Sequence, residues 1–201
     1  MLAREPERWL AQKTIVHVKV FFDGYANAEI LGGDIESLIP IINGFSQFLS
    51  KKYEDSWRSL FKHGYNDSEA FGLYFNEWRS FYSQWQQSSS ASQMAKRQVR
   101  VVDISKTLNH IRSRPGMYFV YPSVSLLFSY LSGLQRSCEC YTTGAHIAPD
   151  IQQFEAWLCR EFSLNKACRW DRLLLVENGF NEQAAFQKFF ERLDQFTRSS
   201  S

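Results

Sequence analysis

Two distant stretches of the chain share one pattern: "GYNDSEAFGLYFNEWRSF" (residues 64–81) and "GFNEQAAFQKFFERLDQF" (residues 179–196). They align without a gap at an offset of 115 residues. The identical positions are Gly64, Asn66, Ala70, Phe71, Phe75 and Phe81, which recur as Gly179, Asn181, Ala185, Phe186, Phe190 and Phe196. A similarity of such long period is typical of an internal duplication. We therefore predict two tandem related helical units.

The spacing of the aromatic residues predicts a helix in each stretch. The i, i+3, i+4, i+7 series is Phe71, Tyr74, Phe75, Trp78, Tyr82 and Trp85 in the first stretch, and Phe186, Phe189, Phe190, Leu193 and Phe196 in the second. This spacing places the rings on one helical face, which usually packs into the core. Asn66 and Asn181 precede the helices and are good candidates for their N-caps.

The likeness continues upstream, where "FSQFLSKKY" (45–53) resembles "FEAWLCREF" (154–162) after a small gap. Between the copies, "QQSSSASQMAKRQVR" (86–100) is polar, rich in serine and without hydrophobic periodicity, which is typical of a linker. The sequence thus predicts a first helical unit over 1–85, a linker over 86–100 and a second helical unit over 101–198.

The first unit begins with a different pattern, "TIVHVKVFFDGYANAEILGG" (14–33). Its β-branched residues alternate, and Asp23-Gly24 is a strong hairpin-turn signal. This favours two strands, roughly 14–22 and 25–31. The alternative is a helix, as expected if the two copies share one fold. The predicted fold class is mainly α with a small N-terminal β-hairpin.

The second unit opens with "IRSRPGMYFVYP" (111–122), which follows a short helical pattern capped by Asp103. Pro115 disfavours helix at the preceding residue, so that helix should end at about Ser113, and Pro122-Ser123 should start the next one. The stretch is either punctuation between helices or a binding loop. For a binding loop, the candidate partner-binding residues are Arg112, Arg114, Tyr118 and Tyr121.

Composition argues against several classes of function. The chain carries 23 Lys and Arg against 21 Asp and Glu, and neither half has the positive excess of a dedicated nucleic-acid or membrane-surface binder. The N-terminus lacks the apolar core of a secretory signal, and no stretch is long and apolar enough for a transmembrane helix. We therefore expect a cytoplasmic protein with no membrane partner. Nucleic-acid binding and a regulatory scaffold role remain alternative hypotheses.

The sequence shows no pattern that predicts catalysis or a cofactor. The four histidines are scattered, and no nucleophile, phosphate-binding or dinucleotide motif is present. The four cysteines (Cys138, Cys140, Cys159 and Cys168) lack the paired Cys-x-x-Cys spacing of a zinc site. We predict reduced thiols, no metal, no cofactor, no catalytic residues and no enzymatic activity.

Residues 104–196 resemble a widespread, poorly characterised bacterial family. Its members pair an Arg-x-Arg-Pro-Gly-Met-Tyr turn with a closing Ala-Phe-x-x-Phe-Phe-x-x-Leu-x-x-Phe helix, here Arg112 to Tyr118 and Ala185 to Phe196. The family resembles immunity proteins of polymorphic toxins. The resemblance implies a protein that binds a cognate toxin and covers its active site. Typical members follow the tyrosine with Leu-Gly, whereas this chain has Phe119-Val120, and the first copy lacks the arginine turn.

Overall fold

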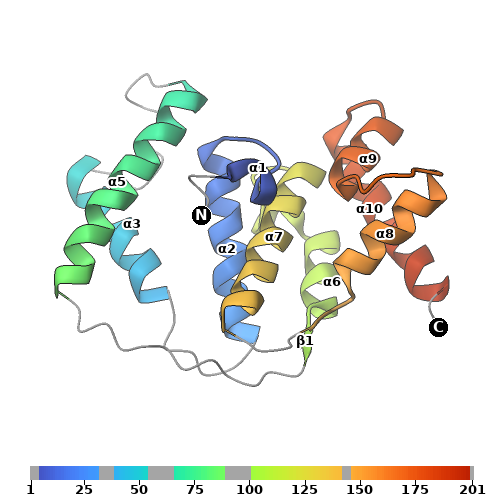
Figure 1. The fold of residues 1–201 in the computed structure, drawn as a ribbon, viewed down its shortest axis with the longest axis horizontal. Helices are drawn as coiled ribbons and strands as arrows, with labels where there is room; N and C mark the ends of the chain where they lie inside the picture. Colours follow the sequence, from blue (N-terminus) through green and yellow to red (C-terminus); the bar gives the residue numbers. More distant parts are fainter. Residues whose placement is uncertain (1–4, 32–38, 54–65, 89–100, 142–145, 200–201) are drawn as a thin grey trace.

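The computed structural model describes residues 5–31, 39–53, 66–88, 101–141 and 146–199, and it is mainly helical (Figure 1). The helices are α1 (Pro6–Trp9), α2 (Ile15–Leu31), α3 (Ile39–Tyr53), α5 (Asp67–Ser88), α6 (Ser105–Ser113), α7 (Val124–Tyr141), α8 (Ile151–Glu161), α9 (Trp170–Glu177) and α10 (Glu182–Ser199), with a 3₁₀ turn, η1 (Pro115–Met117). Two short strands, β1 (Val101–Asp103) and β2 (His146–Ala148), pair in parallel.

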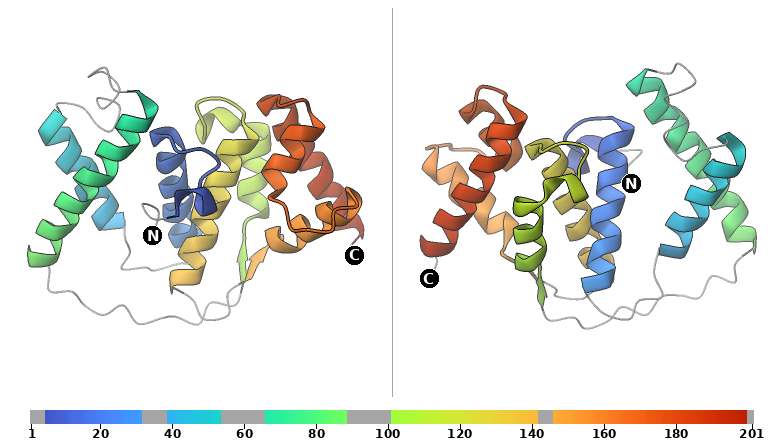
Figure 2. Two further views of the ribbon diagram at one scale, coloured as in Figure 1. Left: turned by 45° about the horizontal axis from the view of Figure 1, so that its top comes forward. Right: turned by 180° about the vertical axis from the view of Figure 1, so that it is seen from behind.

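The helices form a row with α2 and α7 at its centre. Helices α3 and α5 lie on one side of this pair, and α6, α8, α9 and α10 lie on the other, as both views in Figure 2 confirm. Among the described residues, the contact between α2 and α7 is the most extensive between any two elements. The two central helices run in the same direction, so that their N-termini stand at the same end of the molecule.

Two glycines bring these central helices together. A Cβ added to Gly24 would lie 2.0 Å from the carbonyl oxygen of Tyr130, and one added to Gly133 would lie 1.9 Å from the carbonyl oxygen of Phe21. Only glycine permits such close approach of one backbone to another. The contact is reciprocal, since each glycine meets the residue three positions before the other glycine.

The predicted N-terminal hairpin is wrong, because residues 15–31 form the single helix α2. In this segment apolar residues occupy both the odd and the even positions. The pattern therefore did not distinguish a strand from a helix that is buried on several sides. Ile15, Val18 and Phe21 are all buried. Asp23 and Gly24 do not form a turn: Asp23 pairs with Lys19 one helical turn away, and Gly24 lies at the crossing with α7.

The predicted aromatic helices are confirmed as α5 and α10. The second stripe is buried throughout, and in the first stripe Tyr74 and Phe75 are buried, whereas Tyr82 is exposed. Both expected N-caps are also present. The side-chain oxygen of Asn66 accepts a hydrogen bond from Glu69 N at 2.9 Å, and that of Asn181 accepts one from Ala184 N at 2.9 Å.

The buried residues form two clusters that follow the two halves of the chain. One cluster joins α1, α2, α3 and α5, and the other joins α6, α7, α8, α9 and α10, with Val20 of α2 contributing to the second. Helix α5 extends to Ser88, so it includes the first residues of the predicted linker, and the rest of that linker lies outside the described residues.

Candidate functional site

Residues 112–121, here named the arginine turn, connect α6 to α7. The N-cap position of α6 is Ile104 and not the predicted Asp103, whose side chain accepts a hydrogen bond from Ser105 N at 2.9 Å just before the helix; the helix ends at Ser113 as predicted. Arg114 leaves the helical conformation at φ −139° and ψ 60°, in keeping with the fact that Pro115 disfavours the α conformation at the residue before it. The next residues form a tight 3₁₀ turn, in which Tyr118 N donates to Pro115 O at 3.0 Å. The backbone of the turn is therefore well defined.

The inner side of the arginine turn is anchored in the core. Phe119 is buried, with its ring centroid 6.3 Å from that of Phe186. Tyr118 is half-buried and packs edge-on against Tyr130 at 5.8 Å. Of the two tyrosines proposed to bind a partner, Tyr118 thus supports the turn, because much of its ring already contacts other rings.

The outer side of the same turn is apolar and exposed. Met117 is 73% exposed, Val120 76% and Tyr121 53%. Single exposed apolar side chains are ordinary, but three within five residues form a local patch. The sequence pattern indicated Tyr121 but not Met117 or Val120, since neither of these residue types signals binding on its own.

The two arginines of the turn lie in different surroundings. Arg112 Nη1 lies 2.9 Å from Asp194 Oδ2, and its guanidinium sits over the ring of Phe190 at 5.6 Å from the centroid. Arg114 is exposed, and its side chain forms no hydrogen bond or ion pair with any residue that the structure describes. Of these two arginines, Arg114 is the one without a partner in the described part of the chain.

A carboxylate ties the end of the arginine turn to a second turn. Glu182, at the start of α10, accepts hydrogen bonds from Ser123 Oγ at 2.8 Å, Ser125 N at 3.1 Å and Ser125 Oγ at 2.6 Å. The start of α7 and the start of α10 are thereby held side by side. The last two residues of α9 and the residues that connect it to α10 are here together named the α9–α10 turn (residues 176–181).

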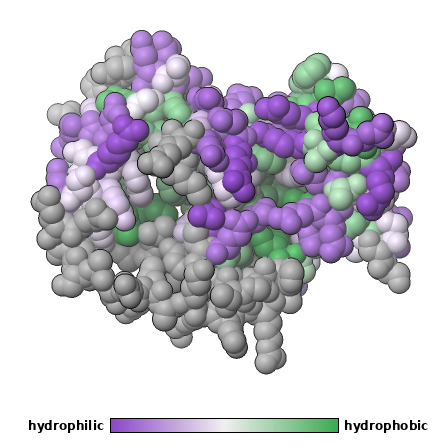
Figure 3. All heavy atoms as spheres, in the orientation of Figure 1, coloured by the Kyte–Doolittle hydropathy of each residue, from purple (hydrophilic) through white to green (hydrophobic). Residues whose placement is uncertain are grey.

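The α9–α10 turn exposes two more apolar side chains, Val176 at 63% and Phe180 at 73%. Apolar residues gather at this corner of the molecule, at the upper right of Figure 3. Gly179 and Phe180 both have left-handed backbones, with φ of 60° and 63°. Glycine takes this conformation without penalty, whereas for phenylalanine it costs about 1–2 kcal/mol. An exposed ring is thus held in an unfavourable backbone conformation.

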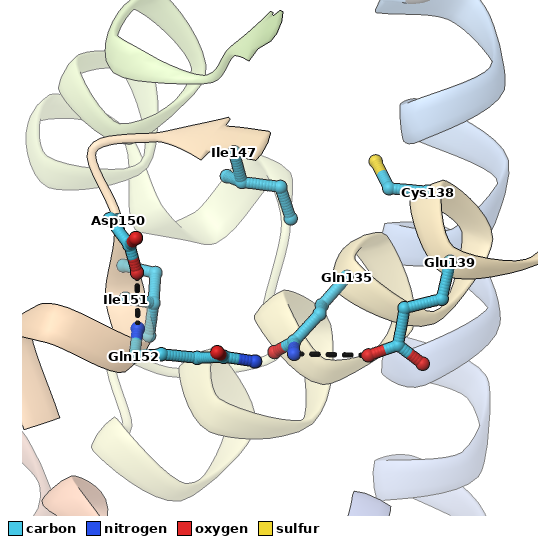
Figure 4. Close-up of a pocket in the computed structure, with 7 residues that line it drawn as sticks. All are labelled: Gln135, Cys138, Glu139, Ile147, Asp150, Ile151 and Gln152. Carbon is cyan, nitrogen blue, oxygen red and sulfur yellow. Dashed lines mark hydrogen bonds between the residues drawn. The ribbon is translucent and has the colours of Figure 1, made fainter. Parts of the chain in front are cut away.

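A small pocket lies between α7 and α8 (Figure 4). Its volume is about 110 Å³, and it is lined by Gln135, Cys138, Glu139, Ile147, Asp150, Ile151 and Gln152. Its polar groups serve local structure: Gln135 bonds to Glu139 at 3.2 Å, and Asp150 caps α8 through Gln152 N at 2.9 Å. Burial raises the pKa of the Cys138 thiol to about 11, so this cysteine is protonated at neutral pH and is not an activated nucleophile.

No group of three or more His, Cys, Asp or Glu side chains within the described ranges is arranged to hold a metal ion. Cys159 and Cys168 are free thiols, and Cys140 has no described side chain. No helix in the described part of the chain is long and apolar enough to cross a membrane.

His17 is a buried titratable group in the first turn of α2. It is 3% exposed, its Nδ1 lies 2.8 Å from Thr14 Oγ1, and its Nε2 is buried without a hydrogen-bond partner among the described residues. Burial lowers the pKa of His17 from 6.5 to about 4. The imidazole is therefore neutral in the folded protein at physiological pH.

We expect the protein to lose stability as the pH falls from about 6.5 towards 4. In this window the unfolded chain takes up a proton at His17 that the folded chain does not, so each pH unit costs about 1.4 kcal/mol. At pH 4.5 the loss relative to pH 7 should be about 2.5 kcal/mol. Urea unfolding at both pH values measures it. The variant His17→Leu should lose this part of the pH dependence, and an unchanged pH profile would show that His17 is not the group responsible.

Comparisons of the chain with protein-family models, with curated proteins and with solved structures found no significant match. The functional proposal therefore rests on the residues of the two turns.

Proposed function

We propose that this protein binds another protein through the arginine turn, and that it neutralises a bacterial toxin in the cytoplasm by covering the toxin's active site. The observation that carries the proposal is the exposed patch of Met117, Val120 and Tyr121 beside the unpaired Arg114. These side chains project from a turn that Phe119 and Tyr118 anchor to the core. A rigid turn loses little conformational freedom on binding, which favours affinity.

To block a toxin, an inhibitor needs a sufficient interface area and a few residues that provide the binding energy. It needs no catalytic activity of its own. An interface of standard size covers about 800 Å² on each partner, enough to close an active-site cleft. A few aromatic and arginine residues near its centre usually provide most of the binding energy. The arginine turn offers both kinds of residue in Tyr121 and Arg114.

We also propose that the two halves of the chain arose by duplication. The correspondence of α2 with α7 at an offset of 109 residues supports this, because the same offset relates Gly24 to Gly133 and the upstream stretch 45–53 to 154–162. Their N-termini are capped alike: Thr14 Oγ1 accepts from His17 N at 3.3 Å, and Ser123 Oγ accepts from Leu126 N at 3.1 Å. The reciprocal glycine contact is what a pair related by two-fold symmetry would make.

If the halves are duplicates, their differences indicate where function was added. The first copy lacks the arginine turn, so binding through that turn belongs to the second copy. In this proposal the first copy serves as support, since α2 packs along α7, the helix that follows the arginine turn.

The double variant Arg112→Ala, Arg114→Ala tests the proposed role. We expect folding to be retained, with a loss of stability below about 1 kcal/mol, because the Arg112–Asp194 pair is half-exposed on both sides. The variant should protect cells poorly against the toxin encoded by the adjacent gene. Growth on co-expression and binding to the purified, catalytically inactivated toxin measure the effect.

A charge-matched control removes two exposed cations elsewhere, Arg160 and Lys166, by substitution with alanine. This control should protect as well as the parent chain. Equal protection by both double variants would place the toxin-binding surface away from the arginine turn. Unfolding of the Arg112→Ala, Arg114→Ala variant would instead assign those arginines a structural role.

A further inference from the structure

The arginine turn and the α9–α10 turn lie at the same end of the molecule. Tyr121 is two residues from Ser123, Phe180 is two residues from Glu182, and Ser123 and Glu182 are hydrogen-bonded at 2.8 Å. This bond joins the chain just after the arginine turn to the chain just after the α9–α10 turn, and each turn exposes apolar side chains. Together they comprise Met117, Val120, Tyr121, Val176 and Phe180.

Phe180 is unfavourable for the isolated chain in two ways. Its ring is 73% exposed to water, and its backbone takes a left-handed conformation at φ 63° that asparagine or glycine would adopt more readily. Backbone strain of this kind persists only where the surrounding structure holds it, here through the helix-end hydrogen bonds from Gly179 N to Val176 O at 3.2 Å and from Phe180 N to Leu175 O at 2.7 Å, and such outliers cluster at functional sites. The observed strain and the exposure of the same side chain point to a ring that is presented for binding.

The charges around the two turns are unbalanced towards positive. The neighbouring carboxylates are already engaged: Glu177 with Arg192, Asp194 with Arg112, and Glu182 with the serines of α7. Arg172 lies one helical turn before Val176 on α9; it is exposed, and its side chain has no ion pair or hydrogen bond within the described part of the chain. Arg114 on the arginine turn is likewise exposed, with no ion pair or hydrogen bond to a described residue.

No acidic residue occurs between Ile104 and Cys138, a segment that includes all of α6 and the arginine turn. Arg114 and Arg172 are therefore cations without an ion pair in the described part of the chain, and both belong to the neighbourhood of the exposed apolar side chains of the two turns. A complementary partner presents carboxylates around an apolar depression.

We infer that both turns form one docking surface for an acidic protein partner, with Phe180 as the ring that enters an apolar pocket on that partner. This inference rests on the proposed function and deepens it, since it adds the α9–α10 turn to the site and states the partner's chemistry. A protein fits better than a nucleic acid because Met117, Val120 and Val176 can neither stack on bases nor pair with phosphates.

The variant Phe180→Asn provides the sharpest test. Asparagine tolerates the left-handed conformation, so the melting temperature should stay the same or rise. Binding to the purified, inactivated product of the adjacent gene should weaken by roughly 30-fold, the size expected for an interface hot spot. Calorimetric titration gives the dissociation constant, and a thermal scan gives the melting temperature. Loss of binding without loss of stability would not be explained by misfolding.

Two further variants complete the test. Leu164→Asn removes an exposed apolar side chain outside both turns and should leave binding unchanged. Arg172→Ala should weaken binding at low salt, and the difference from the parent chain should shrink as the salt concentration rises.

The outcomes separate this inference from the proposed function. If the Arg112→Ala, Arg114→Ala variant weakens binding but Phe180→Asn does not, the arginine turn remains the site and the wider surface is refuted. If the parent chain does not bind the adjacent gene's product, both proposals fail. Tight, strongly salt-dependent binding to a single-stranded DNA 20-mer by the parent chain, lost in Arg172→Ala, would overturn the acidic protein partner.

Discussion

Replacing Gly24 or Gly133 by alanine should reduce the free energy of unfolding by roughly 3 kcal/mol, the upper end of the usual cost of overpacking. The added methyl group would lie 2.0 Å from Tyr130 O in the first case and 1.9 Å from Phe21 O in the second. Both obstacles are backbone atoms, so no side chain can rotate away to make room. The helices α2 and α7 would have to separate along their whole contact. Denaturant unfolding of each variant measures the loss.

The chain contains a matched control for this prediction. Gly72 lies within α5, and an added Cβ there would meet nothing within 4 Å. Gly72→Ala should therefore stabilise the protein by up to about 1 kcal/mol, because alanine favours a helix. If all three variants unfolded at the same denaturant concentration, α2 and α7 would not be in close contact.

Removal of a central ring from the second core should have a similarly large effect. Phe189 is fully buried, with its centroid 4.8 Å from that of Trp170 and 5.4 Å from that of Phe154. Phe189→Ala leaves a cavity among rigid rings that cannot close around it, and we expect a cost of about 3–5 kcal/mol. The shift in the midpoint of guanidinium unfolding, at constant slope, measures this cost.

The control for Phe189→Ala is Tyr82→Ala in α5, which removes an aromatic ring that is 40% exposed from an equivalent helical stripe. Its cost should be well below that of Phe189→Ala, since much of its surface is already in water. Equal destabilisation by the two substitutions would contradict the assignment of Phe189 to the centre of the core.

Local sequence patterns predicted helices α5 and α10, whereas long-range packing decided the secondary structure of residues 15–31. The stripes of α5 and α10 and the caps at Asn66 and Asn181 depend on residues close in sequence, so both were predictable. The state of residues 15–31 depended on a partner helix about 109 residues away. Gly24 is the residue that could have distinguished a helix from a hairpin in this segment. The local sequence suggests a turn at Gly24, whereas its position opposite Gly133 indicates a crossing of two helices.

The candidate site was predictable only in part, for a similar reason. The break at Pro115 and the exposure of Arg114 follow from the nearby sequence. The pairing of Arg112 with Asp194 and the bond between Ser123 and Glu182 join residues far apart in the chain, and neither has a sequence signature. Phe180 was recognised as part of a repeated motif, but its exposure and left-handed backbone depend on how α9 ends.

The pairing of α2 with α7 also determines when α2 can pack while the chain is being synthesised. A ribosome adds about 5–20 residues per second, so α2 emerges roughly 5–20 s before the helix on which it packs. Throughout that interval the glycine face of α2 has no intramolecular partner. On a polysome, a neighbouring chain that is further advanced already displays α7. The same contact that closes the monomer thus offers nascent chains a route to domain-swapped dimers.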